Sequence, residues 1–266
     1  MTLTFSRGPL SATPPEATNY RVEGPKHRLL FEEFPRRLRA VLGSQTVLDT
    51  NRAKLLHESG HLPQVYVPRE DVRDDLLEPS DHTTHCPFKG DASYQSIRAG
   101  DRFAEDAVWA YPEPLEEAAW LRGHVALYWG ALDAWFDEDE EVSGHLRDPY
   151  HRVDVRESSR RVRVLVGGEV VAETNRPMLL SETGLPNRFY IHPEDVRREV
   201  LEPSATHTTC AYKGVASYHA LAVSDARVED GAFFYREPVD GAQKIRDHLC
   251  FYGESIETEV DGERVE

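Results

Sequence analysis

The chain has 266 residues, of which 39% are hydrophobic, and 47 acidic against 31 basic side chains give it a formal net charge of −16. This balance excludes a general nucleic-acid or membrane-surface binder, because such proteins neutralise phosphates with clustered lysine and arginine. No stretch reaches the run of about 18 apolar residues that a transmembrane helix needs, and the first residues lack the apolar segment of a signal peptide. With an odd number of cysteines, three, these features predict a cytoplasmic protein with reduced thiols.

An internal duplication organises the sequence, with the two copies displaced by 124 positions. Residues 51–94 and 175–218 are identical at 22 of 44 positions, and residues 95–128 and 219–252 at 10 of 34. Unrelated stretches would agree at about one position in seventeen, so the likeness is a repeat. It predicts two domains of about a hundred residues. We expect them to be related by a pseudo-two-fold axis, as an internal dimer within a monomer.

The composition along the chain predicts four segments. Residues 1–33 are rich in proline, threonine and glutamate, and we expect an N-terminal arm there. The first repeat domain is predicted at residues 34–142, a linker at 143–159 and the second repeat domain at 160–266.

Each copy opens with a hairpin pattern. Residues 39–42 and 45–49 flank a Gly-Ser turn, and residues 163–166 and 169–173 flank a Gly-Gly turn. Short apolar segments separated by glycine, proline or aspartate follow, which is typical of antiparallel β structure. Prolines at helix-start positions predict short helices at residues 68–72, 115–122, 193–196 and 239–247. The fold class is therefore mainly β, with two tandem antiparallel domains.

A zinc site is suggested by three neighbouring residues of the first copy, His82, His85 and Cys86. The second copy has Thr206 and Thr209 at the two histidine positions, and no Cys-x-x-Cys motif completes a ligand set. Since a structural metal would be needed in both copies, we predict no metal and treat these histidines as loop residues. Phosphate-loop and dinucleotide-binding patterns are also absent from the sequence, so no cofactor is predicted.

One set of polar residues is retained in both copies. Its members are Arg52/Arg176, Glu58/Glu182, Glu78/Glu202, Lys89/Lys213, Ser93/Ser217, Tyr94/Tyr218, Tyr111/Tyr235 and His124/His248. Two explanations stay open. In the first, the set is a buried network in which Glu78 pairs with Lys89 or Arg52. In the second, basic and aromatic side chains line a pocket for an anionic or planar ligand.

The spaced residues of this region also carry a family resemblance. They are Leu76 to Ser80, Thr84, Cys86 to Gly90, Ala92 to Tyr94, Ala107 to Trp109, Tyr111, Pro112, Tyr128, Trp129 and Trp135. The series closely resembles the bacterial domain-of-unknown-function 427 family, in tandem form, and covers nearly all of both copies. The resemblance implies mainly β domains with a tent-like pair of sheets, or a partly open barrel, around an internal cavity.

The family is sometimes labelled nucleotidyltransferase-like, a reaction that needs paired carboxylates to hold magnesium. This sequence lacks that pair. The family's common aromatic and basic positions correspond here to Lys89, Tyr94, Trp109 and Tyr111, and to Lys213, Tyr218, Phe233 and Tyr235. The first copy keeps the fuller aromatic set, so the resemblance predicts that the first domain binds a ligand.

Three functional hypotheses follow. The first is a protein that binds a small anionic or planar ligand in a cavity of a β domain. The second is a group-transfer enzyme that uses Glu78, Lys89 and His124, although no catalytic residue is assigned. The third is a scaffold whose acidic face recruits a protein partner. The candidate ligand-binding residues are Arg52, Glu78, Lys89, Ser93, Tyr94, Trp109, Tyr111, His124, Arg176, Glu202, Lys213, Tyr218 and Tyr235.

Overall fold

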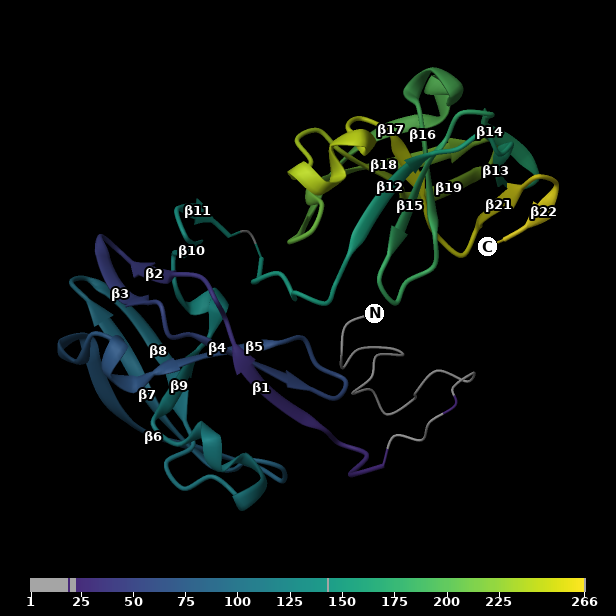
Figure 1. Cartoon of the computed structure of the whole chain (residues 1–266). Coiled ribbons are helices and arrows are strands. Elements are labelled where there is room, and N and C mark those ends of the chain that lie inside the picture. Colours follow the sequence, from purple (N-terminus) through teal and green to yellow (C-terminus); the bar gives the residue numbers. More distant parts are fainter. Residues whose placement is uncertain (1–18, 20–22, 143, 266) are drawn as a thin grey trace. The chain divides into compact units, whose positions relative to one another are not determined.

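The computed structural model describes residue 19, residues 23–142 and residues 144–265 (Figure 1). The chain divides into two compact units, Met1–Tyr150 and His151–Glu266. In Figure 1 the first unit is coloured purple to teal and the second green to yellow. Each unit is mainly β and contains one larger and one smaller antiparallel sheet, as the sequence predicts.

The first unit pairs a seven-stranded sheet, ordered β1-β4-β5-β9-β8-β7-β6, with a four-stranded sheet, ordered β11-β10-β2-β3. The larger sheet consists of β1 (Leu29–Glu33), β4 (Lys54–Glu58), β5 (Gln64–Pro68), β6 (Leu77–Cys86), β7 (Gly90–Ala99), β8 (Arg102–Ala110) and β9 (His124–Leu127). The smaller sheet consists of β2 (Leu38–Leu42), β3 (Gln45–Thr50), β10 (Ala134–Asp137) and β11 (Glu140–Glu141). The helical segments are 3₁₀ turns, η1 (Arg69–Asp71), η2 (Asp74–Leu76), η3 (Glu116–Leu121) and η4 (Trp129–Ala131).

The second unit repeats this topology, with sheets ordered β12-β15-β16-β20-β19-β18-β17 and β14-β13-β21-β22. Its larger sheet consists of β12 (Val153–Glu157), β15 (Met178–Glu182), β16 (Arg188–Ile191), β17 (Leu201–Cys210), β18 (Gly214–Val223), β19 (Ala226–Tyr235) and β20 (Leu249–Phe251). The smaller sheet consists of β13 (Val162–Val166), β14 (Glu169–Thr174), β21 (Ile256–Val260) and β22 (Glu263–Arg264). Its 3₁₀ turns are η5 (Pro193–Asp195), η6 (Arg198–Val200) and η7 (Asp240–Ile245).

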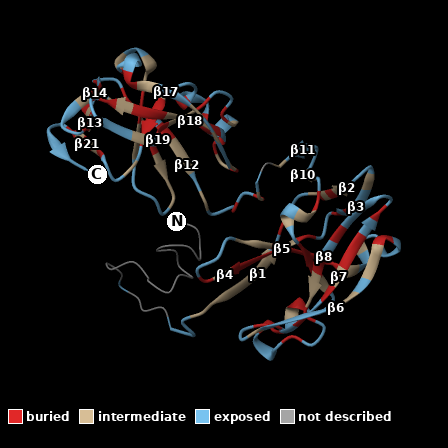
Figure 2. Cartoon of the chain, turned by 180° about the vertical axis from the view of Figure 1, so that it is seen from behind, coloured by how far each residue is buried: buried red, intermediate tan, exposed pale blue. Residues whose placement is uncertain are grey.

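Both faces of the larger sheet are covered, but at different places. Alternation along β7 directs Ala92 and Tyr94 to one face, where they pack near η3, and Ile97 and Ala99 to the other, where the smaller sheet covers them. Figure 2 shows the result as buried residues on β7 and β8 and exposed residues on edge strand β6. Each unit therefore has a core between its sheets and a second apolar cluster on the opposite face of the larger sheet.

Most predicted elements are confirmed. The two hairpins are β2–β3 and β13–β14, and each larger sheet keeps two open edges, so neither closes into a barrel. The four predicted short helices are η1, η3, η5 and η7, formed as 3₁₀ turns. Among the described residues, no helix is long and apolar enough to cross a membrane.

Two predicted boundaries are wrong. Residues 29–33 were expected in the arm but form β1, because Phe31 stacks on Trp120 with ring centroids 4.7 Å apart and Leu29 packs into the same apolar cluster. Residues 153–157 were expected in the linker but form β12, the equivalent edge strand. The rest of the expected arm, apart from residue 19 and residues 23–28, lies outside the described residues, as does residue 143 of the linker.

Candidate functional site

The first unit buries a chain of three polar side chains on the η3 side of its larger sheet. Glu58 ends β4, Lys89 lies in the turn between β6 and β7, and His27 precedes β1. The Glu58 carboxylate accepts a hydrogen bond from His27 Nε2 at 2.8 Å and another from the Lys89 ammonium. Because the side chains of Lys89 and Glu58 are only 9% and 13% exposed, each charge depends on the other for compensation.

The contact between Lys89 and Glu58 requires a curled sheet. Strands β5, β9 and β8 lie between β4 and β7 in the sheet order, which would separate β4 from β7 by about 19 Å in a flat sheet. Two side chains cannot bridge that gap, so the face that carries the pair is concave. This curvature of the larger sheet agrees with the tent-like form that the family resemblance implies.

The second unit repeats the same chain of contacts. His151 Nε2 donates to Glu182 Oε1 at 3.0 Å, and Lys213 donates to the other carboxylate oxygen. The three side chains are between 9% and 11% exposed. We call the set formed by histidine, glutamate and lysine in each unit the buried triad.

The histidine of each buried triad is held by an aromatic ring from the turn that carries the lysine. His27 stacks on Phe88, with centroids 3.6 Å apart and planes 9° from parallel. His151 packs on Tyr212 at 4.1 Å and 32°. The segment that precedes the edge strand is thus fixed to the far side of the concave face.

The glycine that follows each triad lysine is required by the backbone. Gly90 has φ = +101° and Gly214 has φ = +104°, in the region that side chains with a Cβ rarely adopt. A Cβ at Gly214 would lie 3.0 Å from the carbonyl oxygen of Glu237. The same close approach lets the Val239 amide donate to the Lys213 carbonyl at 3.2 Å. The retained Lys-Gly pair therefore positions the lysine and does not indicate a phosphate loop.

Burial and pairing act in opposite directions on the triad glutamates. Burial raises the pKa of Glu58, but hydrogen bonds from Lys89 and His27 and the lysine charge outweigh it, so the pKa lies below its ordinary value. The pKa of Glu182 is lowered in the same way, against burial, by His151 and Lys213. Both glutamates are therefore ionised at neutral pH, which makes them poor proton donors.

Tyrosines cluster beside each buried triad on the concave face. In the first unit Tyr66, Tyr94 and Tyr111 are at least nine-tenths buried, and the Tyr94 hydroxyl forms a hydrogen bond with Thr84 at 3.0 Å. Burial is the main cause that raises the pKa of Tyr66 and of Tyr111. These phenols therefore stay protonated and can donate hydrogen bonds.

The second unit has a cavity of about 580 Å³ at this place, and the cavity is open to solvent. Its lining residues are Leu180, Glu182, Leu185, Pro186, Arg188, Tyr190, Cys210, Lys213, Tyr218, Val228, Glu229, Asp230, Phe233, Tyr235, Tyr252 and Gly253. The triad's Glu182 and Lys213 form part of the wall, with Tyr190 and Tyr235 beside them. Small-molecule sites are typically cavities of this size with aromatic side chains in their walls.

One aromatic difference separates the two copies at the cavity. Trp109 of the first unit donates from its indole nitrogen to the Tyr66 hydroxyl at 3.3 Å and packs against Tyr128. The second unit has Phe233 at this position, which is smaller and has no N–H. Trp109 thus occupies more space beside Tyr66 than Phe233 does beside Tyr190. That the first domain binds a ligand stays a prediction.

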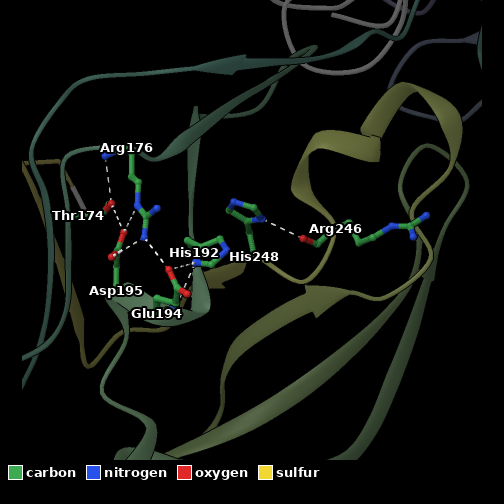
Figure 3. A network of polar contacts seen from close by, with 7 residues as sticks. All are labelled: Thr174, Arg176, His192, Glu194, Asp195, Arg246 and His248. Atoms are coloured by element: carbon green, nitrogen blue, oxygen red, sulfur yellow. Dashed lines mark hydrogen bonds and ion pairs between the residues drawn. The ribbon is translucent and has the colours of Figure 1, made fainter.

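A second polar network, separate from the buried triad, contains the retained arginine and the retained second histidine. In Figure 3, Arg176 pairs with Asp195 and Glu194, each at 3.1 Å, and Thr174 donates to Asp195 at 2.7 Å. His248 donates to the Arg246 carbonyl oxygen at 2.9 Å. The equivalent Arg52 pairs with Asp71, and it shares a hollow of about 420 Å³ with His124.

The expected pairing of Glu78 with Lys89 or Arg52 is wrong. Glu78 lies at the start of edge strand β6 and pairs with Arg98, and both side chains are at least 43% exposed. Glu202 is equivalent and pairs with Arg227. Lys89 follows the opposite end of β6, on the order of 25 Å of extended strand away from Glu78. Lys89 does belong to a buried polar network, but its partner there is Glu58.

The proposed catalytic set of Glu78, Lys89 and His124 is therefore not brought together. Ser93 also points away from the cluster, since it is exposed while its neighbours Ala92 and Tyr94 are buried. Of the thirteen candidates, those on the concave face of the two units are Lys89, Tyr94, Trp109, Tyr111, Lys213, Tyr218 and Tyr235. Apart from Ser93 on the inner strand β7, the others lie at the sheet edge or in the second network.

The two histidines expected in a loop of the first copy lie on strand β6 instead, because this segment pairs with β7, and both have structural partners. His82 packs against Tyr94 with centroids 4.5 Å apart, and His85 pairs with Asp91 at the surface. Within residues 23–142 and 144–265, no group of three or more His, Cys, Asp or Glu side chains is arranged to hold a metal ion. The three cysteines are free thiols.

Sequence reasoning missed two kinds of site residue. His27 and His151 lie 124 positions apart and each precedes an arginine, so extending the repeat comparison toward the N-terminus would have found them. Asp106 and Asp230 are also equivalent, and both adopt positive φ, 48° and 51°, beside irregularities in strand pairing. Such strained positions occur often at sites of function, and Asp230 lines the cavity.

Comparison with known proteins supports the resemblance noted in the sequence. A family model described as a domain of unknown function (DUF427) matches residues 30–138 and again residues 154–263. A search of curated proteins finds no match to the chain. The two matched segments coincide with the two sheet pairs and together span most of the sequence. The chain belongs to the DUF427 family and carries two tandem copies of its domain.

Proposed function

We propose that the protein binds a small planar molecule in the cavity of its second domain. The observation that carries the proposal is the cavity of about 580 Å³ on the concave face, walled by the rings of Tyr190, Tyr218 and Phe233. Phe233 packs against both tyrosines with centroids 5.9 Å apart. Aromatic walls of this kind favour a flat ligand, because ring faces and edges give it large contact area at fixed geometry.

The charges in the wall favour an uncharged ligand over an anion. Three carboxylates, of Glu182, Glu229 and Asp230, face two cations, of Lys213 and Arg188. Lys213 is neutralised by Glu182, so it offers an anion little net attraction. Of the two ligand classes considered from the sequence, the planar class fits this wall better.

A catalytic role receives no comparable support. The residues considered for group transfer lie apart, and the triad glutamates are ionised and engaged by two donors each. A buried ion pair whose carboxylate already accepts two hydrogen bonds is suited to holding the cavity wall in place and poorly suited to proton transfer.

The test is a change taken from the protein's own first copy. Phe233→Trp places the indole of Trp109 into the second unit, where it should fill part of the cavity without harming the fold. Trp109→Phe is the matched reciprocal variant. The compounds to be screened by ligand-observed NMR are uncharged bicyclic aromatics, and we expect some of them to bind the wild-type chain. In the Phe233→Trp variant their affinity should fall at least about tenfold, because about 1.4 kcal/mol is within the usual cost of placing extra bulk in a packed site.

Thermal unfolding of both variants reports whether the fold is intact. Binding that is unchanged in a correctly folded Phe233→Trp protein would refute the proposal, because the ligand would then sit elsewhere. Binding that disappears only with Trp109→Phe would place the site in the first domain.

A further inference from the structure

We infer that the ligand of the second domain carries a carbonyl oxygen, which accepts hydrogen bonds from the hydroxyl groups of Tyr190 and Tyr235. This inference rests on the proposed function and adds the chemical class of the ligand: an uncharged, planar ketone, enone, quinone or lactam. It is carried by two tyrosine hydroxyls that belong to the cavity wall and form no hydrogen bond with the described residues.

The two tyrosines are buried as whole residues and line the cavity. Tyr190 is 1% exposed and Tyr235 is 3% exposed. Among the described residues, neither hydroxyl forms a hydrogen bond, although Tyr218 of the same wall bonds to Thr208 at 2.8 Å. A hydroxyl in the wall of an open cavity, with no protein partner, is available to donate to a ligand in place of water.

The first copy shows what the second lacks. There the hydroxyl equivalent to that of Tyr190 belongs to Tyr66 and accepts a hydrogen bond from the indole of Trp109. Phe233 is smaller than tryptophan and has no N–H, so Tyr190 lacks the donor that Tyr66 has. The exchange changes the space beside the ring and leaves the Tyr190 hydroxyl without a partner among the described residues.

Both hydroxyls border the same part of the cavity. The ring of Phe233 packs edge-to-face with Tyr190 at 88° and with Tyr235 at 90°, with centroids 5.9 and 6.2 Å apart. Phe233 thus stands against both rings. A planar ligand lying on this wall can present one oxygen toward the two phenols, a geometry that resembles a two-donor oxyanion hole.

The carboxylates of the wall accept hydrogen bonds from protein donors other than the two phenols. Glu182 accepts from His151 and Lys213. Glu229 accepts from Arg227 at 2.6 Å, and hydrogen bonds from Ser204 and Thr206 lower the pKa of Asp230. The phenols remain protonated donors at all ordinary pH values, since burial raises the pKa of Tyr190 and of Tyr235.

The excess of carboxylates in the wall argues for a neutral oxygen. A ligand carboxylate would meet Glu229 and Asp230 and gain little from the neutralised Lys213. A carbonyl oxygen accepts two hydrogen bonds without bringing a charge into the cavity. The chemistry of the wall thus separates planar ketones from planar acids of equal size.

The test compares 1-tetralone with tetralin, which differ by one carbonyl oxygen. Dissociation constants are measured by NMR titration of the full chain. For the wild-type protein we expect 1-tetralone to bind about tenfold more tightly, as two hydrogen bonds to otherwise unsatisfied donors imply. Tyr190→Phe and Tyr235→Phe should each reduce that ratio while tetralin keeps its affinity. Tyr150→Phe, which removes a surface hydroxyl bonded to Glu32 in the first unit, is the control.

The outcomes separate this inference from the function on which it rests. Equal affinity for the two compounds, abolished by Phe233→Trp, would keep the planar-ligand site and overturn the carbonyl. A ratio that survives Tyr190→Phe and Tyr235→Phe together would overturn it as well. If neither compound binds the wild-type chain, both proposals fail. Thermal unfolding curves of the two tyrosine variants confirm that any loss is not loss of fold.

Discussion

Removing the carboxylate of a buried triad should destabilise its domain far more than removing an exposed one. Glu58→Gln keeps the shape of the side chain but leaves the Lys89 ammonium, 9% exposed, without a counter-charge. Breaking a buried pair in this way costs roughly 3–5 kcal/mol. Because Glu58 is 13% exposed and glutamine still offers one acceptor oxygen, we expect the lower end, about 3 kcal/mol.

The assay uses the distribution of tryptophan. All four tryptophans lie in the first unit, at positions 109, 120, 129 and 135, so their fluorescence reports the unfolding of that unit alone. With a urea m-value of about 2 kcal/mol per molar, a loss of about 3 kcal/mol lowers the unfolding midpoint by about 1.5 M. Glu78→Gln is the control, since it removes an exposed partner of Arg98 and should shift the midpoint only slightly.

A combined variant tests the stated cause. If the cost of Glu58→Gln comes from the stranded ammonium, then Glu58→Gln with Lys89→Met should recover at least half of the lost midpoint. The reasoning is refuted if Glu58→Gln shifts the midpoint no more than Glu78→Gln does, because the triad would then behave as a surface ion pair.

The remaining predictions concern acid and the backbone. The folded pKa values of Glu58 and Glu182 lie below the ordinary value of about 4.3, so their contribution to stability is present above that pH and is lost as the pH falls through the folded values. The urea midpoint should therefore fall less between pH 6 and pH 3.5 in Glu58→Gln/Glu182→Gln than in wild type, and parallel curves would contradict this. Gly214→Ala should destabilise the second unit by about 1–3 kcal/mol in far-ultraviolet circular dichroism melts, since it strains φ = +104°. Gly241→Ala, where a Cβ meets nothing within 4 Å, is its control, and equal melting temperatures would contradict the expectation.

The repeat allowed much of the fold to be predicted, because local patterns decide hairpins and short turns. Gly43 and Gly167 marked the two hairpin turns, and both hairpins formed in the predicted places. The edge strands were not predicted. Leu29 to Glu33 shows little alternation and is stabilised by the contact of Phe31 with Trp120, far along the chain, and Val153 to Glu157 is held by its pairing with β15. No local pattern contains that information.

The candidate site was predicted in part, for a similar reason. Lys89 and Tyr94 were found because they lie in the least diverged segment. The partner of Lys89 was not, since Glu58 is 31 positions away and meets it only when the larger sheet curls. Glu78 looked equally well retained, yet it lies at an exposed edge with Arg98. Residues that are identical in both copies show only common ancestry. The curvature of the sheet decides which of them, such as Lys89, lie on the concave face and which, such as Glu78, lie at the exposed edge.

The two copies differ in some of the residues around the buried triad and agree in the triad itself. The buried triad makes the same contacts in both units, so the ion pair across the concave face is common to both copies. Two residues of the cavity wall differ between the copies. Trp109 corresponds to Phe233, and Trp129 corresponds to Gly253. Random drift would be expected to change the buried triad and the cavity wall to a similar extent, since replacing a residue of either costs stability. The buried triad is therefore constant between the copies, while the wall beside it loses bulk and an indole donor in the second copy.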